Sequence, residues 1–270
     1  MNEWRLMPFE TGTAYRNMAV DDYMAEYAQQ YRVPVIRFYR WQPAALSIGY
    51  FQKHAQEVNE AACKQNGIHW VRRPTGGRAV LHQHEITYCV AMPLQYPGLP
   101  SSVTESYRWL SLGLVSGLRR LQLPAEMAVT QRTTARGETA ACFDSPSRYE
   151  LLVAGRKVVG SAQIRKGDVL LQHGSILLDF DLELLLRVMA WQSERAQQVA
   201  RRLLRSKAGS IKDFLGTIPS DDCVVKCLLD GFAAEHGLTW WRKPLSQTEQ
   251  ERVGGIIAEK YQTDVWNRKY

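Results

Sequence analysis

A cysteine and a lysine close together in the sequence are the residues whose types could do chemistry jointly. Cys142 lies in AACFDSPSRYE, an irregular stretch with a proline, where a packing role is less natural than in an apolar strand. Lys157 lies in the expected strand RKVVGSAQIR, and the two-residue period predicts that it shares a face with Val159, Ser161 and Gln163. The turns of the surrounding strands allow Lys157 to return toward Cys142.

The chemistry of such a pair is nucleophilic. A free thiol has a pKa near ~8.5, and the thiolate is the nucleophile. An ammonium group about 4 Å away, at an effective dielectric constant near 20, contributes a Coulomb energy of roughly 4 kcal/mol before desolvation. That is enough to lower the thiol pKa by about one or two units. The alternative is an incidental cysteine beside a surface lysine, and the residue pattern alone leaves it open.

A second candidate is the glycine loop, the stretch RRPTGGRAVLH. Gly76 and Gly77 let the backbone approach a ligand without a Cβ in the way. The flanking Arg72, Arg73 and Arg78 favour an anionic or strongly polar ligand. The alternative is a turn whose charges are simply solvated.

Strands and helices follow one another without strict alternation, which predicts an α+β fold with a mixed sheet flanked by helices. Residues 1–180 are expected to form the catalytic core, and 181–270 a mainly helical C-terminal part packed on it. The polar segment Thr130–Ala141 shows no periodicity and predicts a mobile loop. Helices are expected at 15–31, about 57–66, 102–123, 200–207, 221–235 and 246–261, and strands at 33–41, 43–51, 68–72, 78–82, 85–92, 149–153, 156–165 and 169–178.

Two motifs that resemble ligand sites are better explained otherwise. His82 and His84 are spaced for one strand face, with Cys89 nearby, but no second pair of ligands has metal-like spacing, so we expect no metal site. GRKVVGS has the glycine spacing of a phosphate-binding loop, yet serine stands where that loop needs lysine.

Two further pairs predict packing rather than function. Gly113 and Gly117 are spaced for close approach of another element to a helix. Cys223 and Cys227 are four residues apart in an apolar helical stripe, which favours a core position.

Composition sets limits on location and partners. The cysteine count is odd and scattered, which fits reduced thiols, and no apolar run reaches the ~20 residues that span a bilayer. The N-terminal residues lack a signal-peptide pattern, so we expect a cytoplasmic protein. The net charge of +7 attracts anionic partners. The basic run RAQQVARRLLRSK is expected to be a solvated helix face. The second interpretation is a surface on which an acidic protein docks. RNA binding would need an aromatic platform that the run lacks.

Several segments together resemble the lipoate/biotin protein ligase superfamily: WQPAALSIGYFQ, RRPTGGRAVLH, EITY, CFDSP, GRKVVGSAQ and QHGSILLDFD. The glycine loop marks the superfamily. Cys142 in CFDSP, followed by the GRK motif, resembles the cysteine-dependent octanoyltransferases that load the glycine-cleavage H protein.

The resemblance implies acyl transfer in two steps. Cys142 would take an octanoyl group from octanoyl-acyl carrier protein as a thioester and pass it to a lysine of an acceptor protein. Lys157 would lower the thiol pKa and bind the acyl carbonyl. Gly76 and Gly77 would lie against the acyl chain. Arg72, Arg73 and Arg78 would hold the conformation of the loop and contact the phosphate of the carrier protein. His82 would orient the loop or polar groups of the substrate.

No cofactor is implied, because the donor thioester already carries the activation. An ATP-dependent lipoate ligase, whose relatives carry an Asn-Asp pair where this chain has CFDSPSRYE, is the first alternative. An amidotransferase between lipoyl domains is the second, and a binding module without chemistry is the third.

Overall fold

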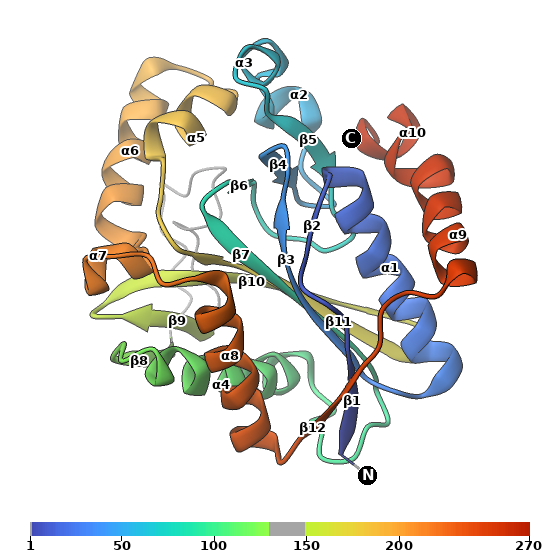
Figure 1. The fold of residues 1–270 in the computed structure, drawn as a ribbon. Coiled ribbons are helices and arrows are strands. Elements are labelled where there is room, and N and C mark those ends of the chain that lie inside the picture. Colours follow the sequence, from blue (N-terminus) through green and yellow to red (C-terminus); the bar gives the residue numbers. More distant parts are fainter. Residues whose placement is uncertain (1, 130–148) are drawn as a thin grey trace.

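The computed structural model describes residues 2–129 and 149–270. Its main element is a mixed nine-stranded sheet with the order β12-β1-β3-β7-β11-β10-β9-β8, in which β2 also pairs with β3 (Figure 1). The expected α+β class with a mixed sheet is confirmed. The strands of this sheet are β1 (Glu3–Leu6), β2 (Glu10–Gly12), β3 (Val35–Trp41), β7 (Glu85–Pro93), β8 (Ala125–Val129), β9 (Tyr149–Val153), β10 (Arg156–Lys166), β11 (Val169–Leu177) and β12 (Thr239–Arg242).

Helices cover both faces of the main sheet. On one face lie α4 (Val103–Arg120) and α8 (Asp221–His236), and on the other α1 (Ala14–Tyr31) with α9 (Gln247–Ile256) beside it (Figure 1). A Cβ on Gly113 would lie 2.5 Å from the Phe232 ring, and one on Gly117 would lie 2.6 Å from the Leu228 Cα. The glycine pair therefore permits close packing of α4 on α8, as predicted.

A second, three-stranded sheet with the order β5-β4-β6 stands at one end of the main sheet. Its strands are β4 (Ala45–Ile48), β5 (His69–Arg72) and β6 (Val80–His82), and its outer face packs on α5 (Leu182–Val188) and α6 (Glu194–Lys207). The glycine loop links β5 to β6, but β4 lies between them. The loop is thus a crossing over the end of β4 and not a hairpin.

The C-terminal part is mainly helical and also completes the main sheet, because β12 runs parallel to β1 at its edge. The expected helix at 57–66 is two helices, and the strands β1, β2, β8 and β12 were not anticipated. No helix within the two described ranges is long and apolar enough to cross a membrane. The remaining helices are α2 (His54–Glu57), α3 (Glu60–Gln65), α7 (Ile211–Leu215), α10 (Asp264–Asn267) and the π-helical turn Ile257–Tyr261.

The predicted core position is wrong for Cys223, which is exposed, while Cys227 is half-buried. The buried stripe of α8 consists of Val224, Leu228 and Phe232. Cys223 is one residue away from that stripe, and one residue turns the side chain by about 100° around the helix.

Candidate active site

A narrow pocket lies between the main sheet and the three-stranded sheet. Its cavity volume is small, about 30 Å³. Aromatic, aliphatic and small residues make most of the wall, and a few polar side chains interrupt it. The lining residues are Met18, Tyr39, Trp41, Ser47, Arg73, Val80, His82, Thr87, Gly160, Ser161, Ala162, His173, Gly174 and Ser175.

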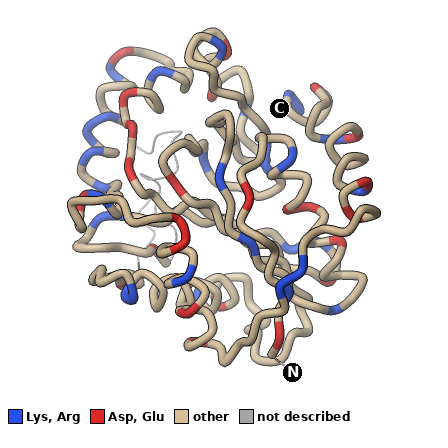
Figure 2. Tube along the Cα trace, in the orientation of Figure 1, with Lys and Arg blue, Asp and Glu red and all other residues tan. Residues whose placement is uncertain are grey.

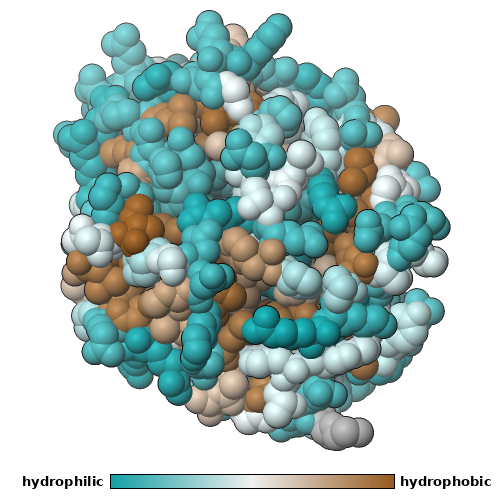
Figure 3. Space-filling view, viewed as in Figure 1, coloured by the Kyte–Doolittle hydropathy of each residue, from teal (hydrophilic) through white to brown (hydrophobic). Residues whose placement is uncertain are grey.

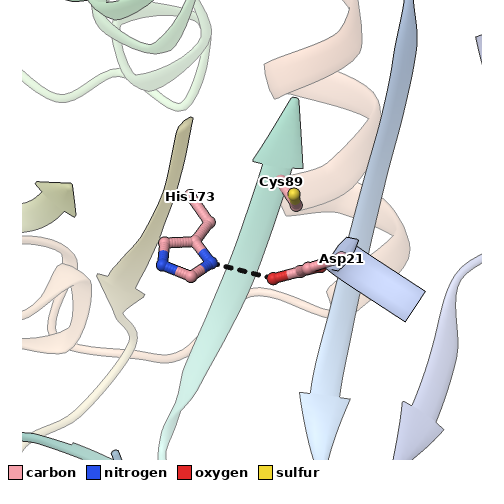
Figure 4. A group of neighbouring side chains, drawn as sticks. All are labelled: Asp21, Cys89 and His173. Atoms are coloured by element: carbon pink, nitrogen blue, oxygen red, sulfur yellow. Dashed lines mark hydrogen bonds and ion pairs between the residues drawn. The ribbon is translucent and has the colours of Figure 1, made fainter. Parts of the chain in front are cut away.

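A buried hydrogen-bonded cluster supports one side of this pocket. The carboxylate of Asp21 accepts bonds from the Arg37 guanidinium at 3.0 Å and from the Tyr39 hydroxyl at 2.9 Å. The His173 Nδ1 lies 2.8 Å from the same carboxylate, and its Nε2 lies 2.7 Å from the Thr75 hydroxyl (Figure 4). The cluster thus ties helix α1 and strand β11 to the glycine loop.

The charges around Asp21 keep its carboxylate ionised although it is buried. Burial opposes ionisation of Asp21, but the charge of Arg37 and the bond from His173 outweigh it and hold the Asp21 pKa below its usual value. Neighbouring Cys89 is fully buried, and burial raises its thiol pKa well above the ordinary range. Cys89 is therefore a neutral packing residue.

The ligand atoms of Asp21, Cys89 and His173 lie within 4.8 Å of one another, a spacing that a metal ion could bridge (Figure 4). The hydrogen-bond pattern favours a different explanation. Asp21 and His173 are bonded to each other, and the Arg37 cation lies 2.9 Å from the same carboxylate. A further cation would meet repulsion from Arg37 and a protonated thiol.

His82 lines the same pocket. Its ring stacks on Trp41 with centroids 4.0 Å apart, its Nε2 lies 2.8 Å from the Ser47 hydroxyl, and its Nδ1 lies 3.3 Å from Glu85. Burial lowers the His82 pKa, and the bond to Glu85 opposes this only in part. The exposed His84 does not join this group. The role predicted for His82 toward substrate stays a prediction.

The glycine loop is shaped from inside by Arg73. Its guanidinium donates to the carbonyls of Ser47, Gly76 and Arg78 at 3.2, 2.9 and 2.7 Å. Gly77 has a φ of +89°, and a Cβ there would lie 2.9 Å from an Arg73 nitrogen and 3.9 Å from the Cβ of Ala162. A glycine is required at this position, and the loop passes over strand β10 at the edge of the pocket.

Arg72 points elsewhere. It is fully buried, and its guanidinium donates to five backbone carbonyls, those of Gly49, Tyr50, Gln52, Trp266 and Asn267. From the sequence, Arg72 was predicted to contact a carrier phosphate together with Arg73 and Arg78. Its surroundings instead favour a positioning role, in which it fastens the glycine loop to the C-terminal segment. Arg78 is half-buried at the loop surface and keeps the predicted ligand role.

Loss of the Arg72 guanidinium should destabilise the fold. Arg72→Ala leaves five carbonyls without their donor, and we expect the free energy of unfolding to fall by about 3 kcal/mol or more. Chemical denaturation measures this, with Arg78→Ala as the matched control, expected to change the value by less than about 0.5 kcal/mol. If the Arg72→Ala protein has native stability but binds the donor poorly, the positioning role is wrong. The predicted contact between Arg72 and the carrier phosphate would then be supported.

Lys157 lies on a different face of its strand from the one predicted. It pairs with Leu152, whereas Val159 pairs with Leu151, so a β-bulge shifts the register between them. Val159 and Leu151 point into the core under α4, and the bulge turns Lys157 to the opposite face. The predicted common face with Val159, Ser161 and Gln163 is therefore wrong. The face that Lys157 occupies is the one where Gly160 and Ala162 line the pocket.

The Lys157 ammonium group is held by a carboxylate. Its Nζ lies 3.1 Å from Glu150 on the adjacent strand β9, and only 8% of the Lys157 side chain and 14% of the Glu150 side chain are exposed. Its carbonyl accepts a bond from Gly209, just after α6. Cys142 and the Thr130–Ala141 segment lie outside the described residues, so the predicted meeting of Cys142 with Lys157 stays a prediction.

The model of the lipoyl protein ligase A/B catalytic domain matches residues 13–233. The chain belongs to this family. It is 45% identical to the octanoyltransferase LipM of Kyrpidia tusciae, over 99% of both chains. It is 43% identical to the octanoyltransferase LipM of Lysinibacillus sphaericus, over 94% of both chains. It also superposes on the bipartite lipoate protein ligase of Thermoplasma acidophilum with a TM-score of 0.83 and 25% identity, over 99% of this chain and 97% of the other.

These findings confirm the predicted superfamily and show an acyltransferase that transfers octanoyl groups in lipoate biosynthesis. Three residues of the candidate site were missed from the sequence: Asp21, His173 and Glu150. The available signal was polarity in an apolar setting, since Asp21 interrupts an apolar helix face and His173 lies within the apolar strand VLLQHGSIL. A buried polar residue needs partners, and such residues often mark a site.

Proposed function

We propose that the enzyme takes the octanoyl group from octanoyl-acyl carrier protein and passes it, through a thioester on Cys142, to a lysine of the glycine-cleavage H protein. The observation that carries the proposal is the placement of Lys157. It is a buried cation that a β-bulge turns to the sheet face on which Gly160 and Ala162 line the pocket. A cation in this position favours a thiolate and a developing oxyanion.

The two steps balance without another reactant. The Cys142 thiolate attacks the donor carbonyl, a carbon–sulfur bond to the enzyme forms, and the carrier thiol leaves as a thiolate that takes up a proton. The neutral amine of the acceptor lysine then attacks the enzyme thioester. An amide forms, the Cys142 thiolate leaves, and the amine releases one proton.

The supporting residues have distinct parts in this scheme. Lys157 lowers the thiol pKa and donates to the acyl carbonyl, and Glu150 holds its ammonium group in place. Gly76, Gly77 and Arg78 lie along the carbonyl end of the acyl group, and Arg73 keeps that loop in shape.

The acyl chain is assigned to the pocket between the two sheets. Its wall of Tyr39, Trp41 and Val80 suits a hydrocarbon chain. Because the free space is only about 30 Å³, a side chain must move to admit eight carbons. Met18 is unbranched and lines the pocket, which makes it the residue best able to move.

The test is a matrix of donors and acceptors, run with and without ATP. We expect transfer from octanoyl-acyl carrier protein to the H protein without ATP, and none from free octanoate even with ATP. Modification that requires the free acid and ATP would show a ligase. Transfer only from octanoyl-H protein to another lipoyl domain would show an amidotransferase, and binding without transfer would show a module that lacks chemistry.

We place the reaction in the cytoplasm, as the sequence predicts.

A further inference from the structure

Helix α6 carries a stripe of exposed arginines that the proposed chemistry does not use. Arg195, Arg202 and Arg205 are exposed, and their spacings of seven and three residues place them on one side of the helix. Figure 2 shows several Lys and Arg positions (blue) along α6, and Figure 3 shows hydrophilic residues over the same margin of the molecule. We call these three residues the arginine stripe.

The stripe begins beside Lys157 and extends away from it. Ala208, directly after α6, forms a bridge with Lys157, and its carbonyl accepts a bond of 2.8 Å from the half-buried Arg156. From Arg205 to Arg195 the helix covers about 15 Å. The C-terminal end of the arginine stripe therefore lies next to the strand segment that carries Lys157.

We propose that the arginine stripe is the docking surface for the octanoyl-acyl carrier protein. This inference rests on the proposed function. Carrier proteins are acidic, so the stripe is complementary to them in charge. The donor also carries its thioester on a long flexible arm, and a surface that starts at Lys157 and leads away from it suits that arm.

The same geometry argues against two other occupants. An acceptor lysine has only its own side chain with which to reach the enzyme thioester, so its domain must sit directly over Lys157 and not along α6. Nucleic acid binds with the help of aromatic stacking platforms, and α6 has no aromatic residue in ERAQQVARRLLRSK.

One of the three arginines is already partly engaged, which guides the choice of variant. Arg205 lies 3.3 Å from Glu183 but keeps 67% of its side chain exposed, so it can also contact a partner. The neighbouring Arg201 is bonded to Glu183 at 2.8 Å and is half-buried. Arg201 is therefore left unchanged, so that the shorter of the two ion pairs between α6 and Glu183 of α5 is kept in the test variant.

The experiment reverses all three charges in the full chain (Arg195→Glu, Arg202→Glu, Arg205→Glu) and compares two donors. With octanoyl-acyl carrier protein we expect KM to rise about tenfold or more at low salt, with kcat little changed. With octanoyl-pantetheine, which has no protein part, we expect kcat/KM within about twofold of native. The control variant reverses three exposed cations elsewhere, Arg120, Lys166 and Arg242, and so changes the net charge by the same amount. Its KM and kcat should match those of the native enzyme with both donors.

Several results would overturn the docking surface while leaving the proposed function intact. An unchanged KM for the carrier donor would do so, as would a rise in KM for the acceptor alone. An equal fall in kcat/KM with both donors would also overturn it, because the stripe would then act on the reaction site and not on the carrier protein. Tight binding of RNA by the native enzyme, abolished by the reversal while the carrier KM stays constant, would assign the stripe to nucleic acid. Failure of the proposed function is distinct, because the native enzyme would then transfer octanoyl from neither donor.

Discussion

Replacement of Cys142 by serine is expected to abolish the acyl-enzyme and to lower turnover by at least about a thousandfold. A hydroxyl stays protonated at neutral pH where a thiol beside a cation ionises, and loss of a nucleophile removes most of an enzyme's rate advantage. Intact-protein mass spectrometry after mixing with octanoyl-acyl carrier protein measures the adduct. The native enzyme should gain one octanoyl group, and Cys142→Ser should gain none.

The chain offers a matched control for this experiment. Cys223 is exposed on α8, so Cys223→Ser removes an accessible thiol far along the sequence from the proposed nucleophile. That variant should keep both the adduct and the activity. Normal turnover by Cys142→Ser, or an adduct that moves with Cys223, would refute the thioester mechanism.

Replacement of Lys157 by alanine should raise the pKa of the Cys142 thiol by about one to two units. With the ammonium group present, the thiolate persists to lower pH; without it, the thiolate appears only at higher pH. Alkylation rate measured against pH should therefore shift upward for Lys157→Ala. At neutral pH the thiolate fraction, and octanoyl transfer with it, should fall about ten- to a hundredfold.

Glu150→Gln separates the charge of Lys157 from its position. This variant removes the carboxylate 3.1 Å from Nζ and leaves the cation, so it should not raise the thiol pKa. It should still lower kcat modestly, because the ammonium loses the group that holds it. An unchanged alkylation profile in Lys157→Ala would refute the role assigned to the lysine.

Much of the fold could be predicted because local pattern and tertiary structure agree. The helix at 15–31 and the meander of β9, β10 and β11 lie within a residue or two of their predicted bounds. The glycines of α4 were predicted as packing residues, and Gly113 and Gly117 do admit α8. Strand β12 was missed because TWWR is short, and its pairing with β1 links residues more than two hundred positions apart.

The site was harder to predict because its partners are distant in sequence. A run of arginines suggests anion binding, but Arg72 finds its acceptors at Trp266 and Asn267. The face of Lys157 depends on a single-residue bulge, which the alternation of VVGSAQ does not reveal. The sequence could name Lys157 as the cation expected beside Cys142, but it could not name Glu150 as the partner of Lys157. Nor could it name Asp21 and His173 as supports of the pocket.

The clasp between Arg72 and the C-terminal segment also has a consequence for biosynthesis. The carbonyls of Trp266 and Asn267 lie 194 and 195 residues after the arginine that they bind. On the ribosome, Arg72 therefore cannot complete its set of hydrogen bonds until α10 has been synthesised. We therefore expect the end of β5, where the glycine loop begins, to become fully fixed only when the C-terminal segment folds against it.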